Sequence, residues 1–563
     1  MMDDVVTRAK RRMQPAGIDP DYDVAYEHFD VMHFLLQAHG LQSSERIDPL
    51  RLFLRNGADA KASPEINFDM QSYLERHPER AKGSGRSPYV DWLTHGRAAG
   101  EIADPAPGVE KMAHVLGLEV GELVDELSSI RLDLQHRLRT GTLGEVFARA
   151  AEVEPLIGEV WAMTTNPNLP PLVWRDTVEQ VAAMQSCQQQ AGFATARLVL
   201  VISDPRWGGG RRMEGHIAHA LTRHVEPEDI VVIYTDSGGA APSGRFPAGV
   251  REVDLAGAVQ GMKRNASHRM LIELIRSFRA DAVVNINARL LYEALETYGK
   301  ALLASERLYL VQFCNEQQAQ GHWVGIPLRF FYRYFDLVDG VLTDSEYLAS
   351  WLRERHQLGP ETEARVQVLR APVDPSIPVV LPEEQRDQRR PQIFWAGRWD
   401  RQKRVDLALE VARRMPDVDL RMWGEAVLSA GHVAEAPDNV RLEGAYGHLS
   451  DLDLSAADVW LYTSAWDGVP SQLLEVGMTT IPIVGSLVGG TGELLDETGA
   501  WPVRDVENPD AYVAAIREVL SDPAGARRRA RDLRQRLLRE RTEEAFSEHV
   551  STLLLDGRRE GRR

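Results

Sequence analysis

Two carboxylates, Asp467 and Glu475, are the residues of this chain whose types and spacing suggest chemistry most directly. Asp467 opens the turn Gly468-Val469-Pro470 after an apolar stretch, and Glu475 lies about one helical turn into the helix predicted next. Open α/β sheets bind ligands where a strand ends and the following helix begins. The N–H groups of a helix start suit anionic or hydroxyl-rich ligands. Two acids converging there could hold the hydroxyl groups of a nucleotide and a sugar.

A basic turn from Gly397 to Lys403 follows an earlier apolar stretch and precedes another predicted helix. Gly397 lets the backbone approach a ligand closely. The guanidinium of Arg398 can bind two phosphate oxygens, and Lys403 adds a point charge. Basic residues on a turn are usually only solvated. This basic turn and the acidic turn Asp467–Pro470 are expected at the same edge of one sheet. Together they predict a site for a diphosphate beside a sugar.

Glycines mark further predicted strand ends. Gly424 ends the next strand and could leave room for a nucleobase, and residues 489–493 open another helix. In the first half, Gly209 and Gly210 follow the strand predicted at 197–202. This glycine run is not a P-loop, because Lys-Ser/Thr is missing, and it lacks the spacing of a dinucleotide fingerprint.

Apolar strands alternate with helices from about residue 196 onward. The predicted strands cover 197–202, 229–235, 281–286, 307–313, 340–343, 365–369, 392–396, 419–423, 440–442, 459–462 and 481–484. Such alternation is typical of parallel sheets covered on both faces by helices. The predicted fold class is therefore α/β, with two tandem Rossmann-like doubly wound parallel sheets preceded by a mostly helical N-terminal region.

The N-terminal region is polar and rich in predicted helix. Two stretches, beginning at Pro49 and Pro88, each show a proline start and a glycine end, which is typical of short helices. We expect a small helical accessory or interaction module, then a helical linker or dimerisation region, two Rossmann-like domains, and a C-terminal helix and tail. The predicted boundaries are 1–107, 108–190, 191–375, 376–535 and 536–563.

Composition excludes several classes of protein. The net charge of −18 argues against a nucleic-acid partner. Cys187 and Cys314 are the only cysteines, and their isolation argues against a disulfide framework or a zinc cluster. The first residues lack the apolar core of a secretory signal, and no stretch approaches the ~18 apolar residues of a membrane span. We expect a cytoplasmic protein.

Three segments together carry a family resemblance: GRWDRQKRVDLALEVA at 397–412, DGVPSQLLEVG at 467–477 and VGGTGELL at 488–495. They resemble the nucleotide-binding half of family 4 glycosyltransferases, a retaining group with the GT-B fold, and the resemblance covers about 196–557. It implies that a hexose or deoxyhexose moves from a nucleoside-diphosphate sugar to a hydroxyl of a glycan or lipid-linked acceptor. The first Rossmann-like domain would bind the acceptor and the second the nucleotide sugar.

The resemblance also assigns roles. Arg398 and Lys403 would bind the donor diphosphate, and the E-x7-E motif of the family maps onto Asp467 and Glu475. Glu475 would hold the donor ribose, and Asp467 would face the donor sugar. Further donor contacts are expected at Gly397, Gly424, Gly468, Val469, Ser471, Gly209 and Gly210.

Two positions depart from the family pattern. The first acid is Asp467, one methylene shorter than the usual Glu, and Thr480 stands where Gly is common. Neither change removes a charge, so we expect activity to survive. The family reaction implies no metal and no cofactor, because cations and helix starts stabilise the leaving group and the acceptor proton passes to the departing phosphate.

The acceptor side is less clearly marked. Asn315, Glu316 and His322 follow the strand predicted at 307–313 and are candidate acceptor contacts, although this loop could equally bond only to itself. The turn at Asp344-Ser345 is more typical of a helix N-cap than of a site.

Two surfaces suggest partners. The arginine-rich last helix either contacts anionic lipid at the inner face of the membrane or forms a solvated face with Glu540, Glu543 and Glu544 as partners. The pattern at 68–96 resembles units found beside bacterial glycosyltransferases of surface-polysaccharide assembly, so residues 1–190 are a candidate for self-association or for binding assembly partners.

Two other functions remain open on the same fold. A weakly active or inactive scaffold subunit would use the chain mainly to recruit partners, and the Asp at 467 is its one support. A nucleotide-sugar epimerase would act on the donor without an acceptor. A phosphorylase would need a pyridoxal-binding lysine, for which there is no sign. The donor sugar, its base, the acceptor and the oligomeric state are not encoded in any recognisable pattern.

Overall fold

The computed structural model divides the chain into two compact units, Met1–Gln185 and Ser186–Arg563. Each unit is described by itself. The described residues are 2–13, 20–37, 48–56, 60, 62–82, 86–103, 109–157, 161, 175–204, 212–236, 244–381, 389–425 and 436–556.

The first sheet of the second unit has seven strands, and all neighbouring strands in it run parallel. In spatial order they are β3 (Arg251–Asp254), β2 (Ile230–Tyr234), β1 (Leu198–Ile202), β4 (Ala282–Ile286), β5 (Arg307–Gln312), β8 (Gly340–Thr343) and β9 (Val366–Val368). The order reverses direction between β1 and β4, which makes this edge a topological switch point. A separate antiparallel hairpin, β6 (Glu316–Gln317) and β7 (Trp323–Val324), follows β5.

The second sheet has six parallel strands. In spatial order they are β12 (Val440–Gly444), β11 (Asp419–Trp423), β10 (Gln392–Ala396), β13 (Val459–Tyr462), β14 (Ile483–Ser486) and β15 (Trp501–Val503). Its switch point lies between β10 and β13. The turns that follow these two strands are the basic and acidic turns of the sequence.

Helices fill the connections between strands. Around the first sheet these are α12 (Arg212–Leu221), α13 (Leu255–Ala258), α14 (Arg264–Ser277), α15 (Arg289–Leu303), α16 (Ile326–Tyr334), α17 (Glu346–Arg355) and α18 (Pro360–Glu363). Around the second they are α19 (Val405–Arg413), α20 (Ser471–Thr479), the short 3-10 turn η9 (Gly489–Glu493), α21 (Pro509–Ser521), α22 (Pro523–Glu540) and α23 (Glu543–Ser551).

Alternation along the strands explains why both faces of the second sheet are covered. Phe394 and Trp460 point to one face and pack with the apolar residues of α20 and α22. Their neighbours Trp395 and Leu461 point to the other face and pack with α19 and α21. Side chains of successive strand residues alternate between faces, so strands that are apolar throughout bury both.

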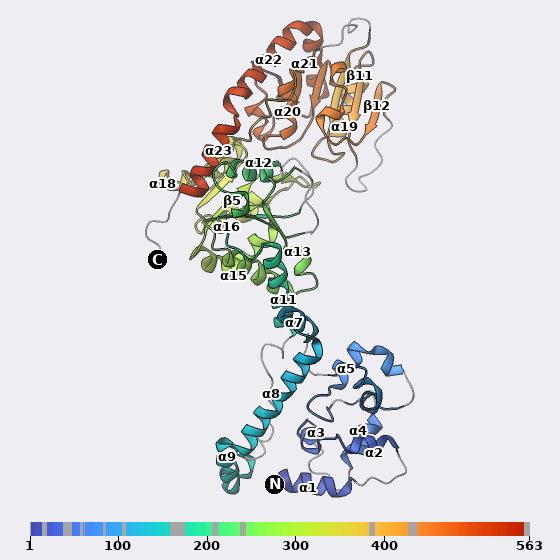
Figure 1. Cartoon of the computed structure of the whole chain (residues 1–563). Coiled ribbons are helices and arrows are strands. Elements are labelled where there is room, and N and C mark those ends of the chain that lie inside the picture. Colours follow the sequence, from blue (N-terminus) through green and yellow to red (C-terminus); the bar gives the residue numbers. More distant parts are fainter. Residues whose placement is uncertain are drawn as a thin grey trace. The chain divides into compact units, whose positions relative to one another are not determined.

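The first sheet is built in the same way. Its strands β1, β2 and β4 pack on one face against α12 and α23, and Figure 1 shows α15 on the opposite side. The chain therefore returns to the first sheet at its end, because α22 covers the second sheet and α23 the first. The predicted fold class, two tandem Rossmann-like doubly wound sheets after a mostly helical region, is confirmed.

The arginine run of α22 has a side that packs against the second sheet and a side that is exposed. Arg527, which is 5% exposed, donates hydrogen bonds to the carbonyls of Val380, Thr480 and Ala457. Arg534 and Arg536 likewise donate to backbone carbonyls. Two of the acids proposed as partners pair elsewhere, since Glu543 and Glu544 form ion pairs with Arg223, which follows α12. Most of this run therefore ties α22 to the second sheet.

The first unit is helical. Its elements are α1 (Met2–Arg12), α2 (Pro20–Tyr26), α3 (Val31–Gln37), α4 (Pro49–Asn56), α5 (Met70–Arg76), η2 (Pro78–Lys82), α6 (Pro88–Asp91), η3 (Trp92–Gly96), α7 (Val109–Leu116), α8 (Val120–Thr140) and α9 (Thr142–Val153), and α11 (Arg175–Gln190) crosses into the second unit. Both predicted proline starts are correct, because α4 begins at Pro49 and α6 at Pro88. Aromatic residues such as Phe53, Phe68 and Tyr89 form the core of the segment up to residue 103. Among the described residues, no helix is long and apolar enough to cross a membrane.

Candidate functional site

The basic and acidic turns meet at the switch point of the second sheet. Strand β10 ends at Ala396 and strand β13 at Tyr462, and the two strands are hydrogen-bonded neighbours. Lys403 Nζ lies 2.7 Å from Asp467 Oδ2, although 64 positions separate them in sequence. Neighbouring parallel strands end at the same edge, so residues far apart in sequence form an ion pair there.

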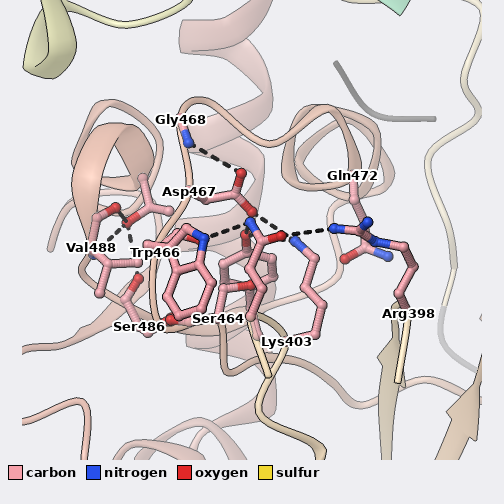
Figure 2. A network of polar contacts seen from close by, with 12 residues as sticks. Arg398, Lys403, Ser464, Trp466, Asp467, Gly468, Gln472, Ser486 and Val488 are labelled. Atoms are coloured by element: carbon pink, nitrogen blue, oxygen red, sulfur yellow. Dashed lines mark hydrogen bonds and ion pairs between the residues drawn. The ribbon is translucent and has the colours of Figure 1, made fainter. Parts of the chain in front are cut away.

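The Asp467 carboxylate is held from three sides (Figure 2). Besides Lys403, the hydroxyl of Tyr462 donates to Oδ2, and the Gly468 N–H donates to Oδ1 at 3.1 Å. Burial, followed by the charge of Asp467, raises the pKa of Tyr462 well above its ordinary value. This hydroxyl therefore stays protonated and acts as a donor, and it fixes the direction of the carboxylate.

Arg398 lies at the same edge of the second sheet, but its side chain is more exposed to solvent than that of Lys403. Its side chain is 57% exposed and pairs with Asp400 at 3.3 Å. It also donates to Gln402 at 2.8 Å, and Gln402 in turn donates to the carbonyl of Trp466, the residue before Asp467. Arg398 is therefore connected to the acidic turn through one side chain (Figure 2). Its exposure leaves most of the guanidinium accessible.

Glu475 has a different partner. It lies in the second turn of α20 and forms an ion pair with Arg212, the first residue of α12 in the first sheet. Burial lowers the pKa of Arg212. The two predicted acids are thus each matched by a cation: Asp467 by one from its own sheet, and Glu475 by one from the other sheet.

Several glycines are needed for close packing of the loops. Gly424 has φ of 141°, and a Cβ there would overlap with the carbonyl of Gly397. Gly489 has φ of 54°, and a Cβ there would overlap with the carbonyl of Asp467. A Cβ on Gly468 would overlap with the carboxylate of Asp344. At these positions contacts within the protein require glycine, whether or not a ligand is bound.

Asp344 is a site residue that the sequence did not reveal. It follows β8 of the first sheet, and its Oδ2 accepts the N–H of Val469 at 3.2 Å. The predicted N-cap is the next residue, Ser345, whose side chain accepts the N–H of Leu348. Burial, and then the charges of Asp467 and Glu493, raise the pKa of Asp344 to about 7. The carboxyl ends of both sheets therefore meet at the acidic turn.

The predicted acceptor residues Asn315, Glu316 and His322 lie between the end of β5 and the turn of the β6–β7 hairpin. Asn315 is half-buried after β5, next to Cys314, whose pKa is raised by burial and then by the charges of Asp467 and Asp344. Glu316 is exposed in β6, and His322 is exposed in the hairpin turn, where its carbonyl accepts the N–H of Gln318. Cys314 thus lies beside the acidic turn, whereas Glu316 and His322 belong to the hairpin.

The hairpin is itself attached to the second sheet. Trp323 of β7 packs edge-on against Trp466, with ring centroids 6.2 Å apart. Arg401 of the basic turn donates to the carbonyl of Gln317 at 3.0 Å and stacks over Trp466. The hairpin therefore contacts the residue immediately before Asp467.

The remaining predicted donor residues occupy the same turn or lie outside the described residues. The N–H of Val469 is bonded to Asp344, and Ser471 is the first residue of α20, where N–H groups have no intrahelical partner. Gly209 and Gly210 fall outside the described residues. Tyr462, Arg212 and Asp344 were missed because a single polar residue at a strand or helix end carries no motif; their contacts with Asp467, Glu475 and Val469 show only in the fold.

Comparison with known proteins agrees with this geometry. Residues 390–522 match the family model for Glycosyl transferases group 1. Glycogen synthases from two strains of Mycobacterium tuberculosis are each 32% identical over 159 residues, which is 26% of this chain and 38% of the relative's length. The matched segment thus spans well under half of these curated relatives.

Two solved structures share the two-sheet fold. Sucrose-phosphate synthase from Thermosynechococcus elongatus superposes with a TM-score of 0.51 at 16% identity, over 63% of this chain and 98% of that one. Anabaena HepE in complex with UDP-glucose superposes with a TM-score of 0.50 at 12% identity, over 64% of this chain and 100% of that one. At these identities the likeness shows the fold, which is the GT-B arrangement of two Rossmann-like sheets.

Proposed function

We propose that this chain is a retaining glycosyltransferase that moves a hexose or deoxyhexose from a nucleoside-diphosphate sugar to a hydroxyl group. The contact between Lys403 and Asp467 at the switch point of the second sheet carries the proposal. Its support is the family match over 390–522 and the fold shared with a protein solved in complex with UDP-glucose.

The basic turn would stabilise the leaving group. Negative charge grows on the diphosphate as the sugar departs, and fixed cations at that point lower the barrier. The ammonium of Lys403 has three N–H donors, and it uses one on Asp467 and one, at 3.4 Å, on the Tyr462 hydroxyl, so the third can bind a phosphate oxygen. Arg398, exposed beside it, can bind a second oxygen. No metal or cofactor is part of this proposal.

The acids would hold the sugar and the ribose. Asp467 accepts hydrogen bonds from Tyr462 and Lys403, and its carboxylate can in turn accept from a donor hydroxyl. Glu475 would bind the ribose hydroxyls in exchange for Arg212. The acceptor hydroxyl would lose its proton to the departing phosphate on the same face of the sugar, which retains the anomeric configuration without a dedicated base.

The acceptor would bind on the side of the first sheet, in a glycan or lipid-linked form. Asn315 follows Cys314, which lies beside the acidic turn, and Glu316 and His322 lie on the hairpin that contacts Trp466. We further propose that residues 1–107 are an accessory module, that 108–190 form a linker or dimerising segment, and that the protein works in bacterial surface-polysaccharide assembly at the inner face of the membrane.

A panel of nucleotide sugars tests the function. Thermal stabilisation identifies the best donor, and product analysis with glycan and lipid-linked acceptors then identifies the reaction. Lys403→Ala is expected to abolish donor stabilisation, whereas Lys300→Ala, a change at an exposed lysine of α15, leaves it intact. Equal stabilisation of both variants would contradict the proposal.

The two rival functions give distinct results in the same experiment. A scaffold subunit would show no transfer with any donor, and Asp467→Ala would change nothing measurable in vitro. An epimerase would convert the nucleotide sugar in the absence of an acceptor. Transfer that needs both Lys403 and an acceptor excludes both rivals.

A further inference from the structure

Asp344 connects the two sheets at the acidic turn. It comes from the end of β8 in the first sheet, and its Oδ2 accepts the N–H of Val469 in the second sheet at 3.2 Å. The side chain keeps some exposure, but its Oδ1 is shut off from solvent and has no hydrogen-bond partner among the described residues. A buried carboxyl oxygen without a partner is costly, so its presence calls for a physical reason.

The packing around Asp344 leaves no room for a Cβ on two neighbouring glycines. A Cβ on Gly468 would overlap with its carboxylate, and a Cβ on Gly490 would overlap with both Ser345 and the backbone of Gly468. The acidic turn is therefore seated directly on Asp344, and Gly490 of η9 packs against both Ser345 and Gly468. Any shift of the Asp344 side chain must move the turn.

Four titratable or charged groups influence Asp344 from the elements packed around it. They are Asp467 of the acidic turn, Glu493 of η9, Cys314 after β5, and Arg541 between α22 and α23. Arg541 is itself paired with Glu493 at 3.1 Å. Burial, and then the charges of Asp467 and Glu493, favour the protonated form of Asp344.

We propose that Asp344 is a positioning residue, which holds the turn Asp467–Val469 against the first sheet and so fixes where the Asp467 carboxylate stands. The carboxyl acts through the turn and does not contact the sugar. Ionised, it places a second negative charge against Asp467 and loosens the turn; protonated, it keeps the turn seated. The placement stands on the contacts alone, and its consequence for sugar transfer rests on the proposed function.

Hydrogen–deuterium exchange of the full chain without ligand tests the placement. The measurement compares the peptide 466–475 in wild type, Asp344→Ala, Asp344→Asn and the control Asp336→Asn, which changes an exposed acid after α16. Asp344→Ala removes the acceptor of the Val469 N–H and is expected to raise exchange of this peptide about tenfold. A peptide covering β10 reports on global unfolding and should not change.

The conservative variant separates positioning from a general loss of structure. Asp344→Asn keeps an acceptor oxygen for the N–H of Val469. Its peptide 466–475 should therefore exchange as slowly as the same peptide of wild type does at acidic pH. In wild type, exchange of 466–475 corrected for its intrinsic rate should rise across neutral pH, and in Asp344→Asn it should stay flat. Unchanged exchange in Asp344→Ala, or the same pH profile in Asp344→Asn and wild type, overturns the inference.

Kinetics then test the consequence for transfer. With the donor found in the panel, Asp344→Ala is expected to lower kcat at least tenfold with a smaller change in KM, because the diphosphate contacts of the basic turn remain. Altered exchange without any nucleotide-sugar transfer would preserve the placement and refute the proposed function. Altered exchange with normal kcat would refute the positioning role.

Discussion

Replacing Asp344 by Asn should make the chain more stable, and by an amount that grows with pH. Burial and the neighbouring acids raise the pKa of this carboxyl from 3.8 to about 7. Between these two values the folded chain holds a proton that the unfolded chain has released. Stability therefore falls as pH rises through this window, and above about pH 7 the full cost of the buried charge is present.

The size of this cost follows from the pKa shift. At about 1.4 kcal/mol per unit, a rise from 3.8 to about 7 corresponds to ~4 kcal/mol for a fully enclosed group. Partial exposure and local relaxation reduce this to about 2 kcal/mol. For a body as large as Ser186–Arg563, at about 2.1 cal/mol/K per residue, that is a shift of Tm of roughly 2–3 °C.

Calorimetric unfolding between pH 4.5 and 8.5 measures the difference between Asp344→Asn and wild type. The difference in Tm between the variant and wild type is expected to increase with pH and to level off above neutrality. Asp336→Asn, at an exposed position, should follow wild type throughout. A difference in Tm that stays constant with pH would show that Asp344 is ionised in the folded chain at every pH tested, which refutes the reasoning.

Three further outcomes follow from the contacts. Lys403→Met should lower kcat/KM for the donor at least 100-fold, about 3 kcal/mol of lost stabilisation, with Lys300→Met as the unchanged control in a coupled assay of nucleotide release. Arg527→Met should lower stability by about 3 kcal/mol, because three buried carbonyls lose their donor, whereas Arg528→Met at an exposed position should not; denaturant midpoints compare the two. Transfer should survive exhaustive chelation with EDTA, measured against an enzyme that requires Mg²⁺.

The sequence predicted the central strands and the edge strands β9 and β12, but it missed the edge strands β3 and β15. Strand β13, and strand β10 after Gln392, are apolar or aromatic throughout, because they are covered on both faces. The edge strand β3 reads Arg-Glu-Val-Asp and buries only Val253, and the edge strand β15 contains Pro502, which cannot donate to a ladder. Edge strands carry weaker apolar patterns because one side has no neighbour.

The same distinction applies to the site. Lys403 and Asp467 were predicted because each belongs to a motif with known spacing, and the ion pair between them follows from adjacent strands. Asp344 and Arg212 belong to no motif, and they matter only because the two sheets meet at the acidic turn. Thr480 has φ of 66°, which explains why Gly is common at this position, yet its conformation could not be read from the sequence.

The shorter acid at 467 is best understood through its partners. Its Oδ2 already receives an ammonium at 2.7 Å and the Tyr462 hydroxyl, and its Oδ1 receives the Gly468 N–H. These donors all come from the second sheet, so the carboxylate is drawn toward its own sheet and away from the first. A Glu here would carry the charge about 1.5 Å further from the backbone and out of this arrangement of donors. The short side chain therefore keeps its charge at these three donors, while Asp344 holds the turn itself through the N–H of Val469.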